Sequence, residues 1–367
     1  MPKILSATKH FQVTKQLRAD IKKLEPNDLV PTAAELEQRY NSSHATIIRA
    51  LTSLRRDGVI YRPAGQKRYQ VAEFTAKPLA RIVIARPQYP SADLDNIVRM
   101  IVLEGQKQHL AFDFKHFMNM SELDLNMATE GRDALVLLPS PEDFPEHIVQ
   151  ALTKPRKPAV IISQHLNLPH VSNVTIADEE LGKIAVQHLQ SLGHTQNLIV
   201  LDQAFDSTIE TRLNGWRKQM AKIIEADAIT KLIFDSEIKP FDDAREVTYQ
   251  HFKSMLQSKD KPNFSAVFCT SMCGAQAVIR ACFELNIRIP EDLSLIAYAG
   301  ESNSGAYIIP PLTTIETDIS SMGQRVCDQL LTLLNNKKPQ PMHVQMPVKV
   351  NGRQTTQPRT NCKHSGH

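Results

Sequence analysis

The sequence predicts an α/β protein built from a small helical domain at the N-terminus and a larger domain of alternating strands and helices. Apolar residues recur at helical spacing over residues 33–56, whereas from Arg81 onward short apolar runs alternate with amphipathic stretches. Pro78 breaks any regular element between the two regions. We therefore predict a first domain at residues 1–72, a linker at 73–79, a second domain at 80–355 and a disordered tail at 356–367.

Length and composition are those of a globular protein with more than one domain. Of the 367 residues, 42% are hydrophobic and 22% are charged. No apolar run approaches the roughly 20 residues that a membrane-spanning helix requires, and the first residues lack the apolar stretch of a signal peptide. The five cysteines are scattered and odd in number, which is typical of a reducing compartment. We therefore expect a cytoplasmic protein.

Positive charge is concentrated at the N-terminus. The chain has a formal net charge of +4, but residues 1–75 carry 13 Lys and Arg against 7 Asp and Glu, which gives that segment a net charge of +6. The rest of the chain is therefore slightly acidic. Contacts with nucleic-acid phosphates require such a basic surface, and a merely solvated basic surface is the alternative.

A capped helix, a turn and a second helix are predicted at residues 33–56. Thr32 and Glu35 form a capping box, in which each side chain binds the backbone amide of the other residue, so a helix begins at Ala33. Polar residues at 41–43 form the turn. The second helix buries one apolar stripe at positions i, i+3, i+4 and i+7, formed by Ile47, Ala50, Leu51 and Leu54.

Further elements are predicted on both sides of this pair of helices. Residues 9–24 have the apolar spacing of a bracing helix, and Gly58 ends the second helix of the pair. Two strands, at 59–62 and 68–71, flank a basic tip. This order of elements is a winged helix-turn-helix, in which the second helix of the pair lies in the major groove of DNA.

The same segment resembles the N-terminal DNA-binding domain of GntR-type bacterial transcription regulators. The residues that match the pattern of that family are Pro31, Glu35–Leu36, Ser43, Thr46–Ile47, Ala50–Leu51, Leu54 and Asp57–Ile60. Ala34 and Ile48 depart from the pattern, because the family usually has arginine at both positions. The loss of two guanidinium groups is expected to change phosphate affinity and operator sequence.

This domain contains a set of candidates for contact with double-stranded DNA. His44, Arg49 and their polar neighbours face away from the apolar stripe. Gly65 would let the backbone of the wing tip approach the minor groove, although a plain turn glycine is the alternative. The full set is Thr32, Ser43, His44, Thr46, Arg49, Arg56, Gly65, Lys67 and Arg68.

Alternating strands and helices in the second domain indicate parallel sheets that are covered on both faces. The predicted strands are residues 80–87, 133–138, 158–163, 197–201, 231–234, 265–269 and 293–298. The predicted helices are residues 97–109, 144–152, 179–192, 210–225, 243–257 and 273–285. Two similar sets of this kind predict two lobes, and a cleft between lobes is where small ligands usually bind.

Four motifs of this domain resemble the effector domain of LacI-type regulators. They are Asp178–His194, Arg212–Trp216, Pro290–Ile296 and Pro310–Ile315, in the order that the family has them. The resemblance implies a periplasmic-binding-protein-like fold, with two lobes joined by three crossovers, in a homodimer. A GntR-type head on a LacI-type sensor is similar to the arrangement of arabinose-repressor-like regulators.

The candidate ligand-binding residues are Ser163, Thr208, Arg212, Thr270 and Glu301. Arg212 lies in a family motif, and its guanidinium offers a fixed fork of donors to sugar hydroxyls or a carboxylate, although a surface arginine is the alternative. Ser163 stands where the family commonly has Asp, Thr270 stands where it has Asn, and Glu301 lies one residue after the usual acidic pair. Because charged acceptors are fewer than usual, the ligand need not be an ordinary free sugar.

No catalytic, metal or cofactor site is predicted. Cys269 and Cys273 lack the paired spacing of a zinc site, and Cys362, His364 and His367 belong to the predicted tail. The sequence contains no Walker loop, no nucleophile elbow and no convincing acid–base pair.

The sequence therefore predicts a ligand-responsive transcription regulator. We expect a homodimeric repressor that binds a pseudo-palindromic DNA operator and a small-molecule effector such as a carbohydrate. The alternatives are an activator with the same sensor, a solute-binding receptor that delivers its ligand to a transporter, and an enzyme on the same two-lobed fold. The basic N-terminal domain argues against a receptor, and the lack of a catalytic constellation argues against an enzyme.

Overall fold

The computed structural model describes residues 9–21, 23–56, 58–63, 65–72, 78–89, 91–168, 170–300, 303–335 and 341–359. The chain divides into two compact units. The first unit, here called the head, ends at Ala80 and also includes His109–Ala111. The second unit, here called the sensor, contains Arg81–Gln108 and the chain from Phe112 onward.

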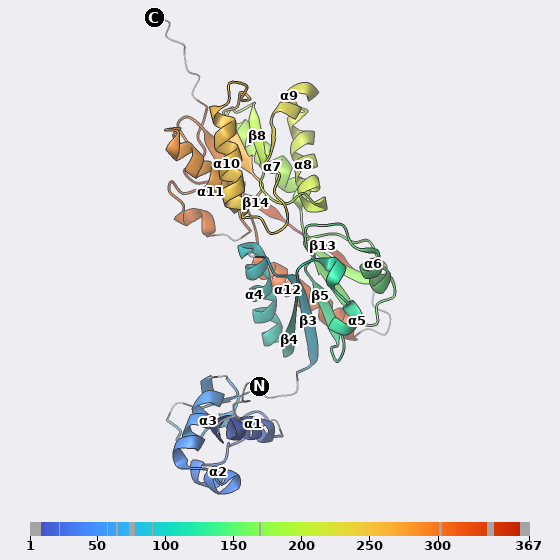
Figure 1. Cartoon of the computed structure of the whole chain (residues 1–367), viewed down its shortest axis with the longest axis vertical. Helices are drawn as coiled ribbons and strands as arrows, with labels where there is room; N and C mark the ends of the chain where they lie inside the picture. The colour runs from blue at the N-terminus through green and yellow to red at the C-terminus, as the bar shows by residue number, and fades with distance from the viewer. Residues whose placement is uncertain are drawn as a thin grey trace, which may run out of the picture. The chain divides into compact units, whose positions relative to one another are not determined.

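Among its described residues, the head contains three helices and a two-stranded hairpin (Figure 1). The elements are α1 (Lys9–Ile21), α2 (Ala33–Tyr40), α3 (His44–Arg56), β1 (Ile60–Tyr61) and β2 (Gln70–Val71). The winged helix-turn-helix that the sequence predicts is therefore present. The first helix ends earlier than predicted, at Ile21, and both strands are shorter than predicted.

Local sequence sets the limits of α2 and α3. Thr32 donates its backbone N–H to Oε2 of Glu35 at 2.7 Å, and Oγ1 of Thr32 accepts from the backbone N–H of Glu35 at 3.3 Å. Asn41 ends α2 with a φ of 43°, and Gly58 follows α3 with a φ of 68°. The helices and the hairpin share one core, formed by Val13, Leu17, Ile21, Val30, Leu36, Ile47, Ala50, Leu51, Leu54, Ile60 and Val71.

The N-lobe of the sensor is a six-stranded sheet in the order β13-β7-β6-β5-β3-β4. Its strands are β3 (Ala80–Pro87), β4 (Leu110–Phe117), β5 (Ala134–Leu137), β6 (Ala159–Ile162), β7 (Val171–Ile176) and β13 (His343–Met346). Its helices are α4 (Ala92–Lys107), α5 (Leu125–Ala128), α6 (Glu146–Thr153) and α12 (Ile319–Asn335), with a short 3-10 helix at Met120–Glu122. β13 and α12 come from the end of the chain, so the N-lobe is assembled from distant segments.

The C-lobe is a second six-stranded sheet, in the order β14-β12-β11-β10-β8-β9. Its strands are β8 (Asn197–Leu201), β9 (Ile233–Asp235), β10 (Ala266–Cys269), β11 (Ser294–Tyr298), β12 (Thr313–Thr317) and β14 (Val348–Asn351). Only β14 is antiparallel to its neighbour within this sheet. The helices are α7 (Asp178–Ser191), α8 (Ser207–Met220), α9 (Ala226–Lys231), α10 (Ala244–Gln257) and α11 (Met272–Glu284), with a 3-10 helix at Ser304–Tyr307.

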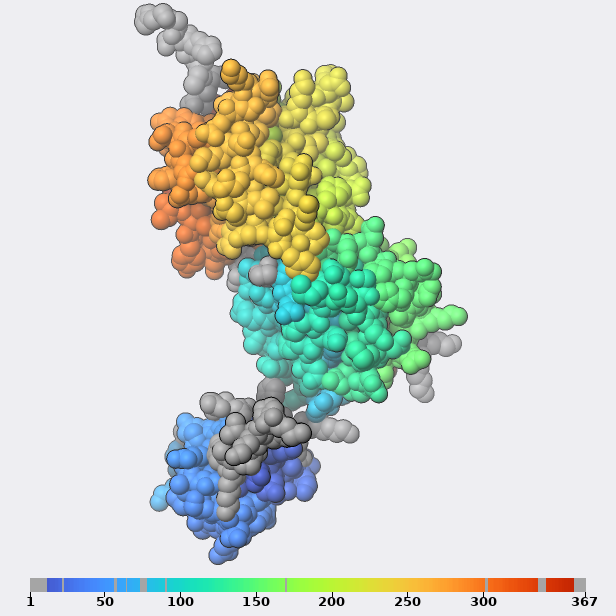
Figure 2. Space-filling view, in the orientation of Figure 1, coloured from blue at the N-terminus to red at the C-terminus, as the bar shows by residue number. Residues whose placement is uncertain are grey.

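Three crossovers join the two lobes. The chain passes from the N-lobe to the C-lobe between β7 and α7, returns between β12 and α12, and crosses again between β13 and β14. A single residue separates the two elements at each crossover, namely Ala177, Asp318 and Pro347. The predicted two-lobed, periplasmic-binding-protein-like fold is confirmed, and the two lobes adjoin each other in the space-filling view of Figure 2.

Side-chain contacts explain two of the boundaries of the sensor that differ from those predicted. The helix predicted at 210–225 begins at Ser207, because Oδ1 of Asp206 accepts from the backbone N–H groups of Thr208 and Ile209 at 2.9 Å each and so caps it. The start of the predicted tail is attached to the C-lobe, because the backbone oxygen of Gln357 lies 3.0 Å from Nε2 of His194. Residues 360–367 lie outside the described residues.

Candidate functional sites

Helix α3 turns one face to the core of the head and the other face to solvent. Its apolar stripe is buried, as predicted. The exposed positions are His44, Ala45, Ile48, Arg49, Thr52 and Arg55. Among the candidate DNA contacts on this helix, His44 and Arg49 are exposed and Thr46 is half-buried. The side chain of Arg56 lies outside the described residues.

Side-chain contacts hold the beginning of α3. The hydroxyl oxygens of Ser43 and Thr46 are 3.0 Å apart, and Nδ1 of His44 lies 2.5 Å from Oε1 of Glu37 on α2. Ser43 is exposed at a helix N-terminus, where backbone N–H groups carry partial positive charge and favour an anion such as phosphate. Thr32 serves as the cap of α2, so its hydroxyl already has a backbone partner.

The hairpin places the remaining candidates of the head on a wing. Gly65 lies at its tip with a φ of 79°, a backbone conformation that favours glycine, and an added Cβ would meet no atom within 4 Å. Lys67 and Arg68 are both exposed. Arg68 also donates from Nη2 to the backbone oxygen of Val30 at 3.3 Å, which fixes the wing to the core of the head. Except for Thr32, which caps α2, the described DNA candidates lie on α3, just before it or on the wing.

In the sensor, helices α7 and α8 approach each other closely at two glycines. A Cβ at Gly182 would lie 2.0 Å from the backbone oxygen of Arg212, and a Cβ at Gly215 would lie 1.9 Å from the backbone oxygen of Glu179. A residue with a side chain does not fit at either position without displacing backbone. This approach brings Asp178, the first residue of α7, beside Arg212 on α8.

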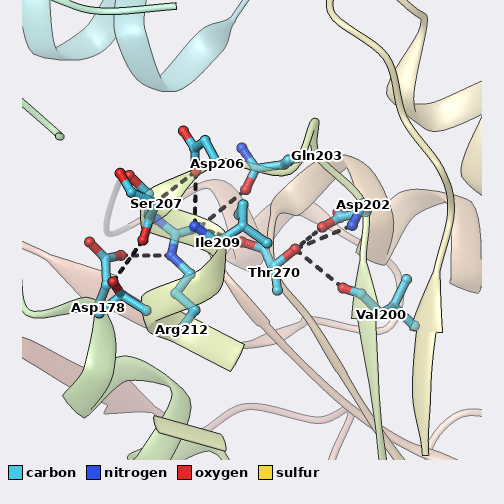
Figure 3. Close-up of polar contacts among 11 residues, drawn as sticks. Asp178, Val200, Asp202, Gln203, Asp206, Ser207, Ile209, Arg212 and Thr270 are labelled. Atoms are coloured by element: carbon cyan, nitrogen blue, oxygen red, sulfur yellow. Dashed lines mark hydrogen bonds and ion pairs between the residues drawn. The ribbon is translucent and has the colours of Figure 1, made fainter. Parts of the chain in front are cut away.

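Arg212 is buried in a hydrogen-bond network and is not a surface arginine (Figure 3). The residue is only 5% exposed. Nε donates to Oδ1 of Asp178 at 2.7 Å, while Nη1 donates to Oε1 of Gln203 at 3.1 Å and to the backbone oxygen of Thr270 at 2.9 Å. The guanidinium carbon lies 4.5 Å from the centroid of the Tyr298 ring. Burial lowers the pKa of Arg212, but Asp178, Tyr298 and Asp206 together more than offset this effect, so the pKa lies above its ordinary value and the guanidinium stays charged.

Thr270 also belongs to a second buried network, centred on Asp202 (Figure 3). The hydroxyls of Thr270 and Ser271 both donate to the Asp202 carboxylate, that of Ser271 at 2.6 Å. Burial raises the pKa of Asp202 to about 6, although these two hydrogen bonds oppose the rise. Thr270 therefore binds Asp202 through its hydroxyl and Arg212 through its carbonyl, and links the two networks.

A cavity of about 810 Å³ adjoins Asp178. It is lined by the beginning of α7 and one side of α8 from the C-lobe and by residues of β7 and β13 from the N-lobe. Ser163 and Thr208, two of the predicted ligand-binding residues, lie in its wall. Arg212 and Thr270 lie behind Asp178 instead of in the wall, and Glu301 lies outside the described residues. Asp178 is thus shared between the cavity and the buried network.

Side-chain contacts between described residues join the lobes. Nε2 of Gln164, which follows β6, donates to Oδ2 of Asp206 at 3.1 Å. The rings of Tyr89 and Phe241 meet edge-on, with centroids 5.8 Å apart. Burial raises the pKa of Tyr89 to about 12, and the carboxylate of Asp206 acts in the same direction. Sequence reasoning named Asp178 only as the start of a family motif and did not single out Gln164 or Asp206, although an aspartate just before a helix, as at Asp206, is the signal of a cap.

Comparison with known proteins identifies the family. Residues 166–356, which are more than half of the chain, match the family described as the periplasmic binding protein-like domain. The chain belongs to this family. Residues 10–67 of the same chain match the bacterial regulatory proteins of the gntR family. This periplasmic-binding-protein-like protein therefore carries a GntR-type helix-turn-helix head.

Relatives of this periplasmic-binding-protein-like protein include named repressors. It is 30% identical to the HTH-type transcriptional repressor PurR of Aliivibrio salmonicida (strain LFI1238) over 226 residues, which are 61% of this chain and 62% of that relative. The match thus spans about three fifths of the relative. That relative is a transcription regulator by name.

Solved structures show the same fold for the sensor. A LacI family transcriptional regulator from Enterococcus faecium with bound ribose matches with a TM-score of 0.65 at 22% identity, covering 76% of this chain and 100% of that chain. The lac repressor dimer bound to operator and the anti-inducer ONPF matches with a TM-score of 0.63 at 20% identity, covering 77% and 95%. The sensor therefore has the LacI-like fold.

None of the described helices combines the length and the apolar composition that a membrane span requires. Within the same residues, no three His, Cys, Asp or Glu side chains gather closely enough to hold a metal ion. Cys269, Cys282 and Cys327 are buried free thiols, and burial raises the pKa of Cys282 to about 12.

Proposed function

We propose that this protein is a ligand-responsive transcription regulator that acts in the cytoplasm as a homodimeric repressor. A small molecule bound between the lobes of the sensor would set its affinity for a pseudo-palindromic operator. One observation carries the proposal, namely that a winged helix-turn-helix with an exposed, basic helix face and a LacI-like two-lobed sensor occur in one chain. Neither half by itself would imply regulation by a ligand.

The head would bind DNA with α3 in the major groove and the wing near the minor groove. Exposed Arg49 on α3 and exposed Lys67 and Arg68 on the wing supply positive charge on both surfaces. Contacts of this kind release counterions from DNA, so binding is expected to weaken steeply as salt concentration rises.

The effector that suits the cavity is a carbohydrate or a carbohydrate derivative. Hydroxyl-bearing side chains are frequent in its wall, namely those of Ser163, Thr175, Ser207, Thr208 and Thr211. Hydroxyl groups both donate and accept, so they can exchange hydrogen bonds with the hydroxyls of a ligand. A protein of the same fold binds ribose. In this proposal Arg212 acts on the ligand indirectly, because it holds the carboxylate of Asp178 in place.

The crossovers supply the coupling between ligand and DNA. The cavity is lined by both lobes, so a ligand that prefers one lobe arrangement shifts the population toward it. The lobes would turn about the single-residue connections Ala177, Asp318 and Pro347. In a dimer, that turn would change the separation of the two heads and hence their fit to two operator half-sites.

Exposed apolar side chains of the C-lobe support a homodimer. Phe283, Tyr307 and Ile309 are 75%, 85% and 87% exposed. Phe283 lies near the end of α11, while Tyr307 and Ile309 follow β11, which pairs with the strand that precedes α11. Large apolar groups at this level of exposure are typical of protein–protein contacts. A second copy of the chain would bury them.

Fluorescence anisotropy with the full chain and the DNA upstream of its own coding region tests DNA binding. We expect salt-dependent binding that is weakened in the double variant Arg49→Ala/Lys67→Ala. Lys107→Ala is the control, because Lys107 is also exposed but lies in the sensor. A chain that leaves this DNA unbound at low salt would contradict the proposal.

Thermal-shift measurements with ribose and glucose as probes test the cavity. A bound ligand raises the melting temperature by mass action, and Thr208→Ala is expected to reduce that rise. Ser320→Ala, in the sensor but outside the cavity, should leave it unchanged. An undiminished shift in Thr208→Ala would place the ligand elsewhere.

A further inference from the structure

Helix α3 carries one large apolar side chain on a face that is otherwise polar and basic. Ile48 is 42% exposed, whereas its neighbour Ile47 is fully buried in the core of the head. Ile48 lies one helical turn after His44 and one turn before Thr52, which are both exposed. The isoleucine is therefore in the middle of the exposed stripe, where a helix in the major groove comes closest to the base edges.

The exposed face of α3 has basic residues around an apolar centre at Ile48. Arg49 and Arg55 are exposed on this face and supply positive charge. At the beginning of the helix, the hydroxyl of Ser43 and Nδ1 of His44 already contact other side chains of the head. The basic residues suit phosphates, whereas the centre of the stripe requires an apolar partner.

We infer that Ile48 recognises the 5-methyl group of thymine and thereby makes a thymine–adenine pair a specificity determinant in each half of the operator. This inference rests on the proposed function, because it requires α3 to lie in the major groove. In that groove the thymine methyl is the apolar group that a base pair presents. An arginine at the same position would instead donate to O6 and N7 of guanine. Isoleucine has no donor, and it gains free energy only by burying apolar surface.

Charge favours DNA over a second protein as the partner of this face. Residues 1–75 carry a net charge of +6, and the arginines on the same helix face would repel another copy of the head. Double-stranded DNA supplies both the negative phosphates and the methyl group. A protein partner is an outcome that the experiment below distinguishes.

The experiment begins with the full chain and a random-sequence duplex library. Bound duplexes are sequenced for the wild type and for Ile48→Arg. We expect the wild type to enrich a half-site with a thymine at a position where Ile48→Arg enriches guanine. Synthetic duplexes with uracil in place of that thymine then remove only the methyl group.

Anisotropy should show about fourfold weaker binding by the wild type for each uracil, the loss expected for one buried methyl group. Ile48→Ala should bind the thymine and uracil duplexes equally. Met127→Ala, which changes a 60% exposed apolar residue of the sensor, is the control and should keep the wild-type preference.

Each alternative outcome has a distinct meaning. Equal binding of thymine and uracil duplexes by the wild type overturns the inference and leaves DNA binding intact. The same enriched half-site for the wild type and Ile48→Arg also overturns it. Loss of dimer in Ile48→Ala with an unchanged base preference assigns Ile48 to a protein contact, against the inference. If no duplex is enriched at low salt, the proposed function fails as well.

Discussion

The head and the sensor present their polar side chains in opposite ways. On α3, His44, Arg49 and Thr52 are exposed to solvent, whereas in the sensor Arg212 and Asp202 are buried and bound to other residues of the protein. The head can bind a partner with little rearrangement. A ligand in the cavity of the sensor would instead lie beside groups that already bind one another, because Asp178 belongs to both the cavity wall and the buried network. In the proposed function, DNA recognition therefore depends on an exposed surface, and the response to ligand depends on the cavity and the buried network behind it.

Removal of the buried guanidinium has the largest expected effect. Arg212→Ala leaves the Asp178 carboxylate buried without its partner and the Thr270 carbonyl without a donor. We expect the free energy of unfolding to fall by about 3–5 kcal/mol. Urea denaturation of the full chain measures it through the fluorescence of Trp216, the single tryptophan, which is buried in α8 of the sensor.

Arg217→Ala is the matched control, because Arg217 is exposed on the same helix. Its effect should stay within about 0.5 kcal/mol. If Arg212→Ala lowers the free energy of unfolding no more than this control does, the buried network does not stabilise the sensor. The contrast drawn between the head and the sensor would then be wrong.

The buried Asp202 gives the sensor a pH dependence that Asp202→Asn should remove. Its native pKa of about 6 lies above the unfolded value of about 3.9, so the native state binds the proton more tightly. The contribution of Asp202 to stability therefore falls as pH rises between about 4 and 6, by roughly 3 kcal/mol in all. Between pH 4 and 7, the free energy of unfolding of Asp202→Asn, measured by urea denaturation, should rise by that amount relative to the wild type. A difference that is independent of pH would contradict this account.

A smaller loss of stability is expected from a substitution where α7 and α8 approach each other closely. Gly182→Ala would place a Cβ 2.0 Å from the backbone oxygen of Arg212, so one helix must shift. We expect a loss of about 1–3 kcal/mol in the free energy of unfolding. Gly352→Ala is the control, because an added Cβ there meets nothing within 4 Å. Equal stabilities of the two variants would show that α7 and α8 separate freely.

The smallest effect is expected in the head. Thr32→Ala removes the side-chain cap of α2 and should cost about 1 kcal/mol, while Thr32→Ser keeps the hydroxyl and should cost less. Hydrogen exchange of the α2 amides measures the loss, and the amides of α8 in the sensor serve as an internal control. Equal protection of α2 in Thr32→Ala and the wild type would argue against the cap.

Elements with local or apolar determinants could be predicted from the sequence. The capping box places the start of α2 at Ala33, and the apolar runs of β3 and β8 define those strands residue by residue. These patterns lie within a few residues of each other, so no knowledge of the tertiary structure is needed.

Strands that bury polar residues could not be predicted in the same way. β7 buries Ser172, whose hydroxyl donates to Gln329, and β12 buries Glu316, which pairs with Arg353 at 2.8 Å. The partners that make such burial favourable lie far away in sequence. We predicted neither strand for this reason.

The candidate sites also differ in how far local sequence could predict them. The exposed residues of α3 could be predicted from helical periodicity alone. Arg212 could be recognised from its motif, but its partner Asp178 lies 34 residues earlier, and only the fold brings them together. Whether a polar residue faces a ligand or another residue of the protein is decided by tertiary structure.

Reciprocal titration of DNA and ligand tests the central claim most directly. The Kd of the full chain for its operator is measured by anisotropy with and without a saturating sugar found by thermal shift, and the Kd for the sugar is measured with and without operator. Coupling between a surface and a buried network predicts the same factor in both ratios, because linkage is reciprocal, with a typical size of about 5- to 150-fold. A DNA affinity that is identical with and without bound sugar would contradict the account.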